Sequence, residues 1–266
     1  MYTNLISDVI IIIMKKNRVL VSDYDETIRV NNSISNETIN AINAWYDSNY
    51  FIVASGRSLN SLKSNLDSFK VNYDYLISNN GGVIVDKNDR LLFISYINYD
   101  VALSLIAHVD KLDISAYVVN DGIKRAMKVK DQARLSNRYN DADDFIDYDE
   151  MITQKRIAQL IVLVDSFEIA VSIAEVINDK FEDIVAYPNK TCVDIVCKGI
   201  NKSSGIKFIN DIHGFDQIYT IGDSSNDIDM IQKYNGYAVK NSSEDLLKVS
   251  KNVVESITDL IENITN

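Results

Sequence analysis

The chain has 266 residues, of which 46% are hydrophobic, enough to bury a core in one large domain or two smaller ones. Its 27 Lys and Arg are outnumbered by 38 Asp and Glu, so the formal net charge is −11. We expect no nucleic-acid partner, because sequence-independent binding to nucleic acid needs a basic footprint. Anionic ligands are repelled at long range, so a phosphate site here requires local positive charge or a metal ion.

The N-terminus carries a short apolar run at residues 9–14, with three basic residues directly after it. A membrane span needs ~20 apolar residues, and a signal peptide carries its positive charge before the apolar stretch. We therefore expect no membrane partner. Residues 1–13 are either an upstream extension that the fold does not need or an ordinary extra strand or helix, and the sequence favours neither.

The two cysteines, Cys192 and Cys197, form neither a CxxC motif nor a disulfide framework. Five positions apart on a strand, they would face opposite sides, as packing residues do. Free cysteines of this kind are typical of a reducing compartment, so we expect a cytoplasmic protein.

Alternating strand and helix patterns fill the first part of the chain after residue 17. Repeats of this kind are βαβ units, and they form a parallel sheet. Ligands of such sheets bind beyond the carboxyl ends of the strands, and each polar cluster in this region lies at such an end. The predicted elements are strands at 18–22, 50–54 and 75–78, a helix at 35–46 with Ser35 as its N-cap, and a helix ending near 69.

The pattern changes after Gly82, where a hairpin at 83–94 is followed by helices and strands without parallel winding. This mixture indicates an α+β insert. From Lys202 the helix–strand alternation returns. The predicted fold class is α/β: a Rossmann-like, doubly wound parallel core at residues 14–83 and 188–266, with an inserted α+β cap at residues 84–187 that sets substrate specificity.

Two aspartates follow the first predicted strand, Asp23 and Asp25. Carboxylates two positions apart on an extended turn can point into one site, where they repel each other unless a proton or a cation lies between them. The pair suits a metal-assisted nucleophile, Asp23, beside an acid/base, Asp25. Alone the motif is weak, because acidic loop ends are common.

A second acidic turn, at residues 222–227, ends another predicted strand and supplies Asp223, Asn226 and Asp227. Hard oxygen ligands of this type suit Mg²⁺. A simple capped turn is the alternative interpretation, in which Asp223 or Ser224 only caps the next helix.

Two further clusters offer groups for an anion. Ser55, Gly56 and Arg57 provide a hydroxyl and backbone N–H groups at a helix start. Lys202 begins a helix, where a cation is unfavourable for the helix dipole, so a nearby phosphate or aspartate is expected to offset it.

In order along the chain, these motifs resemble those of the haloacid dehalogenase-like hydrolase superfamily. The ones that match are Asp23-x-Asp25-x-Thr27, Ser55-Gly56-Arg57, Lys202 and Gly222-Asp223-x-x-Asn226-Asp227. The Ala-Ser-Gly-Arg wording, Asn79-Asn80-Gly81-Gly82 and an insert between the second and third motifs are similar to the Cof-type branch, which carries a large α/β cap. The resemblance covers the chain from about Lys16 to its end.

The resemblance implies a role for each motif residue. Asp23 would attack phosphorus and form an aspartyl-phosphate, Asp25 would act as the acid/base, and Lys202 would neutralise charge. The implied Mg²⁺ ligands are Asp23, the backbone carbonyl of Asp25, and Asp223, with Asp227 beside them orienting Lys202 or a metal-bound water. The implied substrate- and phosphate-binding residues are Thr27, which also orders the loop, Ser55, Gly56, Arg57, Asn80, Lys202 and Asn226.

The predicted function is that of a Mg²⁺-dependent phosphatase of a small phosphorylated metabolite, a sugar phosphate or a phosphorylated cofactor, acting as a monomer or weak homodimer. Two alternatives stay open, a hexose phosphomutase-like phosphotransferase and a catalytically weak phosphometabolite-binding regulatory protein. Glu26, which stands where the family usually has glycine, argues mildly for the last. The intact Asp23, Asp25, Lys202 and Asp223 argue against it.

Overall fold

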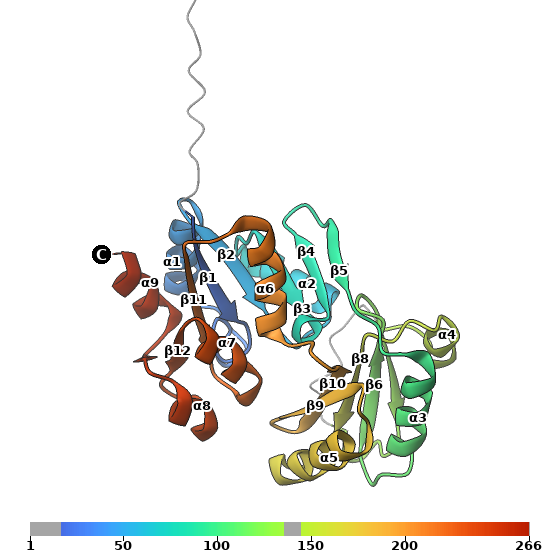
Figure 1. Ribbon diagram of the computed structural model, residues 1–266. Helices are drawn as coiled ribbons and strands as arrows, with labels where there is room; N and C mark the ends of the chain where they lie inside the picture. Colours follow the sequence, from blue (N-terminus) through green and yellow to red (C-terminus); the bar gives the residue numbers. More distant parts are fainter. Residues whose placement is uncertain (1–16, 136–144, 266) are drawn as a thin grey trace, which may run out of the picture.

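The computed structural model describes residues 17–135 and 145–265, so the two interpretations of residues 1–13 lie outside the described residues. The described chain forms two sheets (Figure 1). One has eight strands in the order β13-β12-β11-β1-β2-β3-β4-β5, and the other has five in the order β7-β6-β8-β10-β9. Among the described helices, none is long and apolar enough to cross a membrane.

The large sheet is parallel from β13 to β3 and ends in an antiparallel hairpin. Its strands are β1 (Arg18–Asp23), β2 (Tyr50–Ala54), β3 (Tyr75–Ser78), β4 (Val83–Asp86), β5 (Leu91–Ile94), β11 (Gln217–Gly222), β12 (Asn235–Val239) and β13 (Val253–Val254). The helices that cover it are α1 (Asn36–Tyr46), α2 (Leu59–Phe69), α6 (Lys202–His213), α7 (Ile228–Lys233), α8 (Glu244–Val249) and α9 (Ile257–Thr265).

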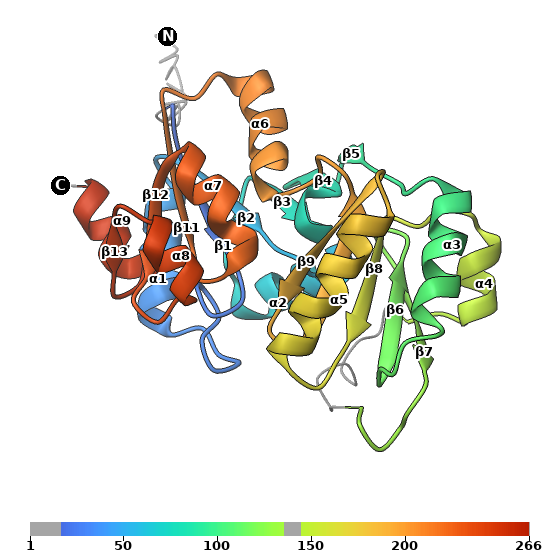
Figure 2. The same ribbon diagram turned by 60° about the horizontal axis from the view of Figure 1, so that its bottom comes forward.

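Helices lie on both faces of this sheet. Successive side chains of its apolar strands point to opposite sides, so both faces need to be covered. Leu20 of β1 packs with the face covered by α1, α2 and α9. Its neighbours Val19 and Val21 pack with the face covered by α6, α7 and α8. The predicted doubly wound α/β fold is confirmed. In Figures 1 and 2, α9 lies on the side of this sheet away from the small one.

Strand β1 lies between β2 and β11, so the chain winds outward from it in both directions. Ligands of doubly wound sheets bind at this switch point, beyond the carboxyl ends of the strands. The register pairs Ser22 with Ile221 on one side and Asp23 with Ala54 on the other. The loops that follow β1, β2 and β11 therefore meet at one edge.

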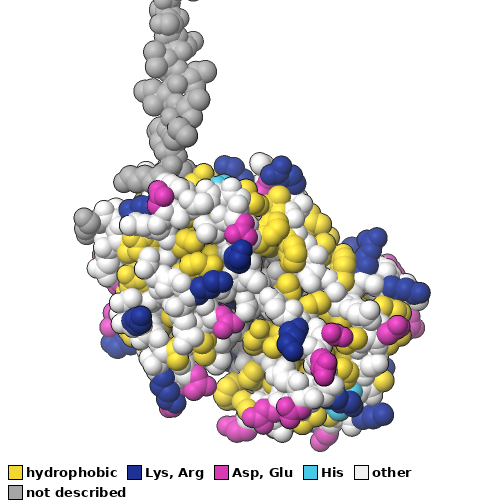
Figure 3. All heavy atoms as spheres, in the orientation of Figure 1, with side chains coloured by type: hydrophobic (Ala, Val, Ile, Leu, Met, Phe, Trp, Pro, Cys, Tyr) yellow, Lys and Arg dark blue, Asp and Glu magenta, His cyan; other side chains and the backbone are white. Residues whose placement is uncertain are grey.

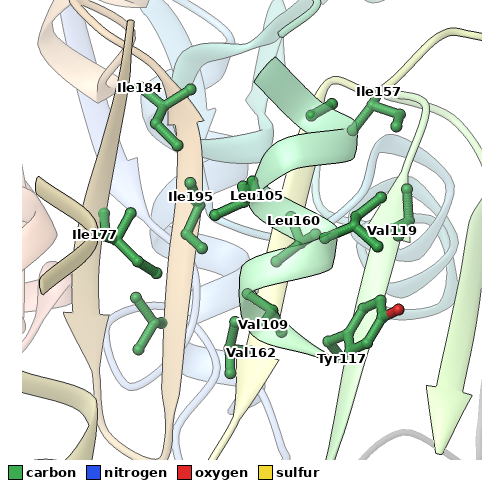
Figure 4. Close-up of a cluster of buried hydrophobic side chains, with 14 of the residues drawn as sticks. Leu105, Val109, Tyr117, Val119, Ile157, Leu160, Val162, Ile177, Ile184 and Ile195 are labelled. Carbon is green, nitrogen blue, oxygen red and sulfur yellow. The ribbon is translucent and has the colours of Figure 1, made fainter. Parts of the chain in front are cut away.

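The small sheet is antiparallel and carries helices on one face. Its strands are β6 (Ala116–Asn120), β7 (Arg125–Val129), β8 (Gln159–Leu163), β9 (Ile184–Asn189) and β10 (Cys192–Cys197), and its helices are α3 (Tyr99–Val109), α4 (Tyr148–Thr153) and α5 (Phe167–Lys180). Leu105, Leu160, Ile177 and Ile195 belong to the buried cluster between strands and helices (Figure 4). On the face drawn in Figure 3, basic and acidic side chains are interspersed.

The predicted insert boundaries, 84 and 187, differ from those of the two sheets. Strands β4 and β5 extend the large sheet, because β4 pairs with β3. Strand β10 completes the small sheet, so the chain leaves that sheet only after Cys197. Strands β7 and β10 were not among the predicted elements, because Arg125, Lys128 and Asp194 interrupt their apolar patterns.

Candidate active site

A buried lysine joins two buried aspartates at the carboxyl edge of the large sheet. Asp23 ends β1, and Lys202 begins α6 directly after Asn201, which caps that helix in a reciprocal capping box. Lys202 Nζ donates hydrogen bonds to Asp23 Oδ1 at 2.5 Å and to Asp227 Oδ1 at 2.7 Å. Burial alone would lower the pKa of Lys202, but the charges of Asp227 and Asp23 raise it above its usual value. The two carboxylates thus offset the unfavourable placement of a cation at a helix start.

The other oxygen of Asp227 organises the loop after β11. Asp227 Oδ2 accepts hydrogen bonds from the N–H groups of Asp223 and Ser224, both at 3.1 Å. A Cβ at Gly222 would lie 2.4 Å from Asp227 Cγ, so only glycine lets the strand end approach this carboxylate. The turn is therefore more than a helix cap, because one aspartate shapes the loop and holds the lysine.

Asp23, Asp223 and Asp227 form a buried trio whose ligand atoms all lie within 4.8 Å of one another. Burial, opposed by Lys202, raises the pKa of Asp23. Burial and the charge of Asp227 raise the pKa of Asp223 to about 6. The three carboxylates repel one another, and a divalent cation between them would remove that repulsion. Carboxylate oxygens are also the hard donors that Mg²⁺ prefers. The trio therefore fits a divalent metal ion.

The carboxylate of Asp25 is not part of this trio. It accepts hydrogen bonds from Arg57 Nε at Oδ2 and from Arg57 Nη2 at Oδ1, both at 2.7 Å, a side-on bidentate pair. Arg29 Nη1 lies 3.5 Å from Oδ1. The prediction that Asp25 helps to hold the metal therefore does not extend to its side chain. It rests on the backbone carbonyl alone.

The same contact occupies the side chain of Arg57. Its guanidinium binds Asp25, and its Nη1 donates to Ser61 Oγ at 3.2 Å. Its backbone N–H donates to Ser55 Oγ, also at 3.2 Å. In the structure this side chain holds Asp25, because bidentate pairing fixes the carboxylate plane, and its contact with phosphate stays a prediction.

Asn80 lies beside the Ser55–Gly56 loop with an unusual backbone conformation. It belongs to the 3₁₀ turn η1 (Asn79–Gly81) and has φ 53°. Its Oδ1 accepts a hydrogen bond from Asn226 Nδ2 at 3.1 Å, while its own Nδ2 is buried without a partner among the described residues. Buried donors are rarely left unpaired, so this amide is a natural contact for an anion at the loop.

A cavity of about 590 Å³ lies over these groups and receives side chains from both sheets. The loops of the large sheet supply Asp23, Asp25, Ser55, Gly56, Arg57, Asp223 and Asn226, and the small sheet supplies Arg125, Ile161, Asn189, Lys190, Cys192 and Asp194. The strand ends thus bring most of the predicted residues together around one cavity.

Thr27 does not line this cavity. It is 3% exposed and lines a neighbouring cavity of about 600 Å³, and its Oγ1 has no hydrogen-bond partner within the described parts of the chain. Lys190, at the turn between β9 and β10, borders both cavities, and its Nζ lies 3.7 Å from Asp223 Oδ2. Lys202, although buried, reaches the site through its hydrogen bond to Asp23, and Asp227 is linked to the site through Lys202.

The small-sheet residues around the cavity were not predicted. Asp194 is 4% exposed and stands in the middle of an otherwise apolar strand. A lone charge on one face of a period-two pattern was the signal that could have found it. Gln159, which is fully buried, carried no comparable signal.

Comparison with known proteins identifies relatives of the whole chain. The sequence profile of the haloacid dehalogenase-like hydrolase family matches residues 20–260. The fold is similar to that of a HAD/COF-like hydrolase from Plasmodium vivax, with a TM-score of 0.81, 19% identity, and coverage of 93% of this chain and 95% of that one. A phosphatase of the superfamily from Bacteroides thetaiotaomicron is similar with a TM-score of 0.78 and 20% identity, and the match covers 94% of this chain and 94% of that one. A subclass IIB sugar phosphatase is similar with a TM-score of 0.77 and 19% identity, and the match covers 93% of this chain and 99% of that one.

Proposed function

We propose that this chain, which belongs to the haloacid dehalogenase-like hydrolase family, is a Mg²⁺-dependent phosphatase of small phosphorylated metabolites with Asp23 as its nucleophile. The buried Asp23–Lys202–Asp227 group beside Asp223 carries the proposal. Phosphoryl transfer depends on positioning and charge neutralisation. This group holds a carboxylate in a fixed place and offers donors for a metal that would balance the incoming phosphate.

The proposed reaction has two steps. A carboxylate oxygen of Asp23 attacks phosphorus, and the bond between phosphorus and the leaving oxygen breaks as Asp25 donates a proton to that oxygen. Asp25 then accepts a proton from water, whose oxygen attacks the phosphorus of the aspartyl-phosphate. Inorganic phosphate leaves and Asp23 is restored. Arg57 supports this scheme because it fixes the Asp25 carboxylate through both of its oxygens.

The phosphoryl oxygens would be held by groups around the loop after β2. We assign this role to Ser55 Oγ, the Gly56 N–H, Asn80 Nδ2, Asn226 and Lys202. The unpartnered Asn80 donor beside Gly56 supports the assignment, since a Cβ at Gly56 would lie 3.2 Å from that nitrogen. Thr27 is assigned to the support of the loop from the neighbouring cavity.

Asp23, Asp223 and the Asp25 carbonyl would hold Mg²⁺, with Asp227 orienting Lys202. When bound, the ion would supply positive charge to the phosphoryl oxygens and the nucleophile. This chain's own part is to keep the trio of carboxylates close together in a buried place. The insert, as a cap, would set which leaving group enters the cavity.

The test is phosphate release from a panel of phosphorylated sugars and phosphorylated cofactors, with Mg²⁺ and with excess chelator. We expect release with Mg²⁺ and loss of release with chelator. A mutase would instead isomerise a hexose phosphate without net release, and a regulatory protein would bind a ligand without turnover. Either of those results contradicts the phosphatase assignment, and full turnover in chelator contradicts the metal.

A further inference from the structure

Three buried side-chain amides link the small sheet to the Ser55–Gly56 loop, which follows β2 in the large sheet. Asn120 Nδ2 donates to Asn79 Oδ1 at 2.9 Å and to Gln159 Oε1 at 3.2 Å. Gln159 Nε2 donates onward to the Gly56 carbonyl at 3.3 Å. All three amide side chains belong to residues that are 0% exposed. We call Asn79, Asn120 and Gln159 the amide relay.

The amide relay crosses between the two sheets. Asn120 ends β6 and Gln159 begins β8, both in the small sheet, whereas Asn79 follows β3 and Gly56 follows β2 in the large one. Buried amides cost free energy unless each donor and acceptor is paired. A fully paired polar network fixes one arrangement of its members, so the relay sets the position of the small sheet against this loop.

The bond to Gly56 acts on a particular peptide group. The Gly56 carbonyl and the Arg57 N–H lie in one plane, because the peptide bond is rigid. The Arg57 N–H donates to Ser55 Oγ at 3.2 Å. A donor on the Gly56 carbonyl therefore also fixes the Ser55 contact and the direction in which the Arg57 side chain leaves the backbone.

Arg57 in turn holds Asp25 through two hydrogen bonds of 2.7 Å. A chain of contacts thus runs from Gln159 through the Gly56–Arg57 peptide to the Asp25 carboxylate. Gln159 also lies 3.4 Å from Asp194 Oδ1, which faces the same cavity.

We infer that Gln159 is a positioning residue that couples the placement of the small sheet to the orientation of Asp25. The inference rests on the proposed function. It assigns to the small sheet a part in proton transfer as well as in the choice of leaving group. When the small sheet is in place, the Gly56 carbonyl is bound and Asp25 is held. Loss of the Gln159 donor should loosen that hold.

The test uses leaving-group dependence in the full-length protein. Gln159→Leu and Gln159→Met remove the donor at similar volume, and two variants guard against failure of one to fold. An alkyl phosphate needs a proton on its leaving oxygen, whereas a nitrophenyl phosphate does not. We expect kcat for the alkyl ester to fall on the order of 10-fold, with a smaller change for the aryl ester and little change in KM.

Two comparisons separate positioning from a general loss of structure. Asn178→Leu removes an amide whose hydrogen bonds, among the described residues, go to the Ala186 backbone within the small-sheet region, and it should affect both esters equally. In an Asp25→Asn background, Gln159→Leu should no longer change the ratio between the esters.

Each outcome decides the matter. Equal loss for both esters in the Gln159 variants, or a ratio that still changes in the Asp25→Asn background, overturns the inference and leaves the proposed function standing. If the unchanged protein hydrolyses neither ester nor any member of the metabolite panel, the proposed function fails and the inference fails with it.

Discussion

The two sheets contribute different kinds of groups to the shared cavity. The large sheet supplies charges at the ends of parallel strands, buried and tied to one another: Lys202 is 1% exposed and bridges two carboxylates. The small sheet supplies groups from strand faces and one turn, and the Lys190 side chain there is 45% exposed. Ends of adjacent parallel strands converge by topology, whereas face residues depend on how one sheet is placed against another.

This difference separates the roles of the two sheets in the proposed reaction. Groups that need a fixed geometry, such as Asp23 and its lysine, gain it from strand ends that the whole sheet holds in register. Groups that meet the leaving group can lie on a sheet that is built from a separate core. Variants in the two regions should therefore change different quantities.

The largest expected effect is that of Asp23→Asn in the large sheet. The variant lacks the attacking carboxylate, so no phosphoenzyme can form and turnover should fall to background. The measurement is phosphate release from an aryl phosphate, with mass spectrometry of the Asp23 peptide after rapid quenching. Near-normal activity, or a phosphoryl group on another residue, would contradict the assignment of the nucleophile.

Asp25→Asn should be slower than the unchanged protein but not inactive. The nucleophile stays intact, and loss of general acid–base catalysis costs roughly 10²–10⁴-fold. The loss should be smaller for an aryl phosphate than for an alkyl phosphate, and phosphorylated Asp23 should accumulate. A matched control is Asp211→Asn, which lies in an exposed ion pair with Lys207 on α6 and should leave turnover unchanged.

The large sheet was predicted well from the sequence because its site residues lie at strand ends. The strands β1, β2 and β3 are continuous apolar runs closed by polar turns, and their bounds were predicted within about one residue. The site residues at their ends followed from topology. What the sequence could not provide was side-chain pairing across loops, such as the pair between Arg57 and Asp25.

The small sheet was predicted less completely for a physical reason. Most of its site residues belong to strands, where a charge such as Asp194 interrupts the apolar pattern instead of marking a strand end. The β4–β5 hairpin was assigned to the insert because it breaks the helix–strand alternation. Its pairing with β3 depends on contacts that no local pattern reports.

A small-sheet variant, Asp194→Asn, tests whether the small sheet acts on the leaving group. Its carboxylate faces the cavity and accepts hydrogen bonds from Gln159 and Asn189. A charged hydrogen bond to a leaving group is worth ~1.5–3 kcal/mol, so kcat/KM for different metabolite phosphates should change relative to one another by about 10-fold or more. An equal change for every substrate would show that Asp194 acts on the common step and would break the comparison.

The charges of Asp23, Asp223 and Asp227 predict that the stability of the metal-free protein depends on pH. Burial raises the pKa of Asp223 from 3.8 to about 6, so the folded state binds a proton more tightly than the unfolded chain. This contribution to stability is present below about pH 4 and is lost as the pH rises through about 6. We expect the melting temperature of the chelated protein, relative to that of Asp223→Asn, to fall over this window. Added Mg²⁺ should restore it at neutral pH. Parallel profiles for the two proteins would contradict the prediction.

The smallest expected effect concerns Glu26, which lies in the loop between Asp25 and Thr27 and lines the cavity beside Lys190. Its φ is 62°, in the left-handed region, and its N–H donates to the Arg29 carbonyl at 2.7 Å. A side chain there is strained, so Glu26→Gly should stabilise the protein by about 0.5–1 kcal/mol after the greater freedom of glycine in the unfolded chain is counted.

Glu26→Ala separates this backbone effect from the charge, because it removes the carboxylate but keeps a Cβ at the same φ. We expect urea unfolding to give Glu26→Gly a higher free energy of unfolding than Glu26→Ala. Equal stabilities would mean that the loop relaxes around any side chain. If both variants instead raise the turnover of an anionic substrate by the same factor, the Glu26 charge limits activity through repulsion at the cavity and the backbone has no part in it. That result would assign to one large-sheet loop residue the substrate discrimination that we place in the small sheet.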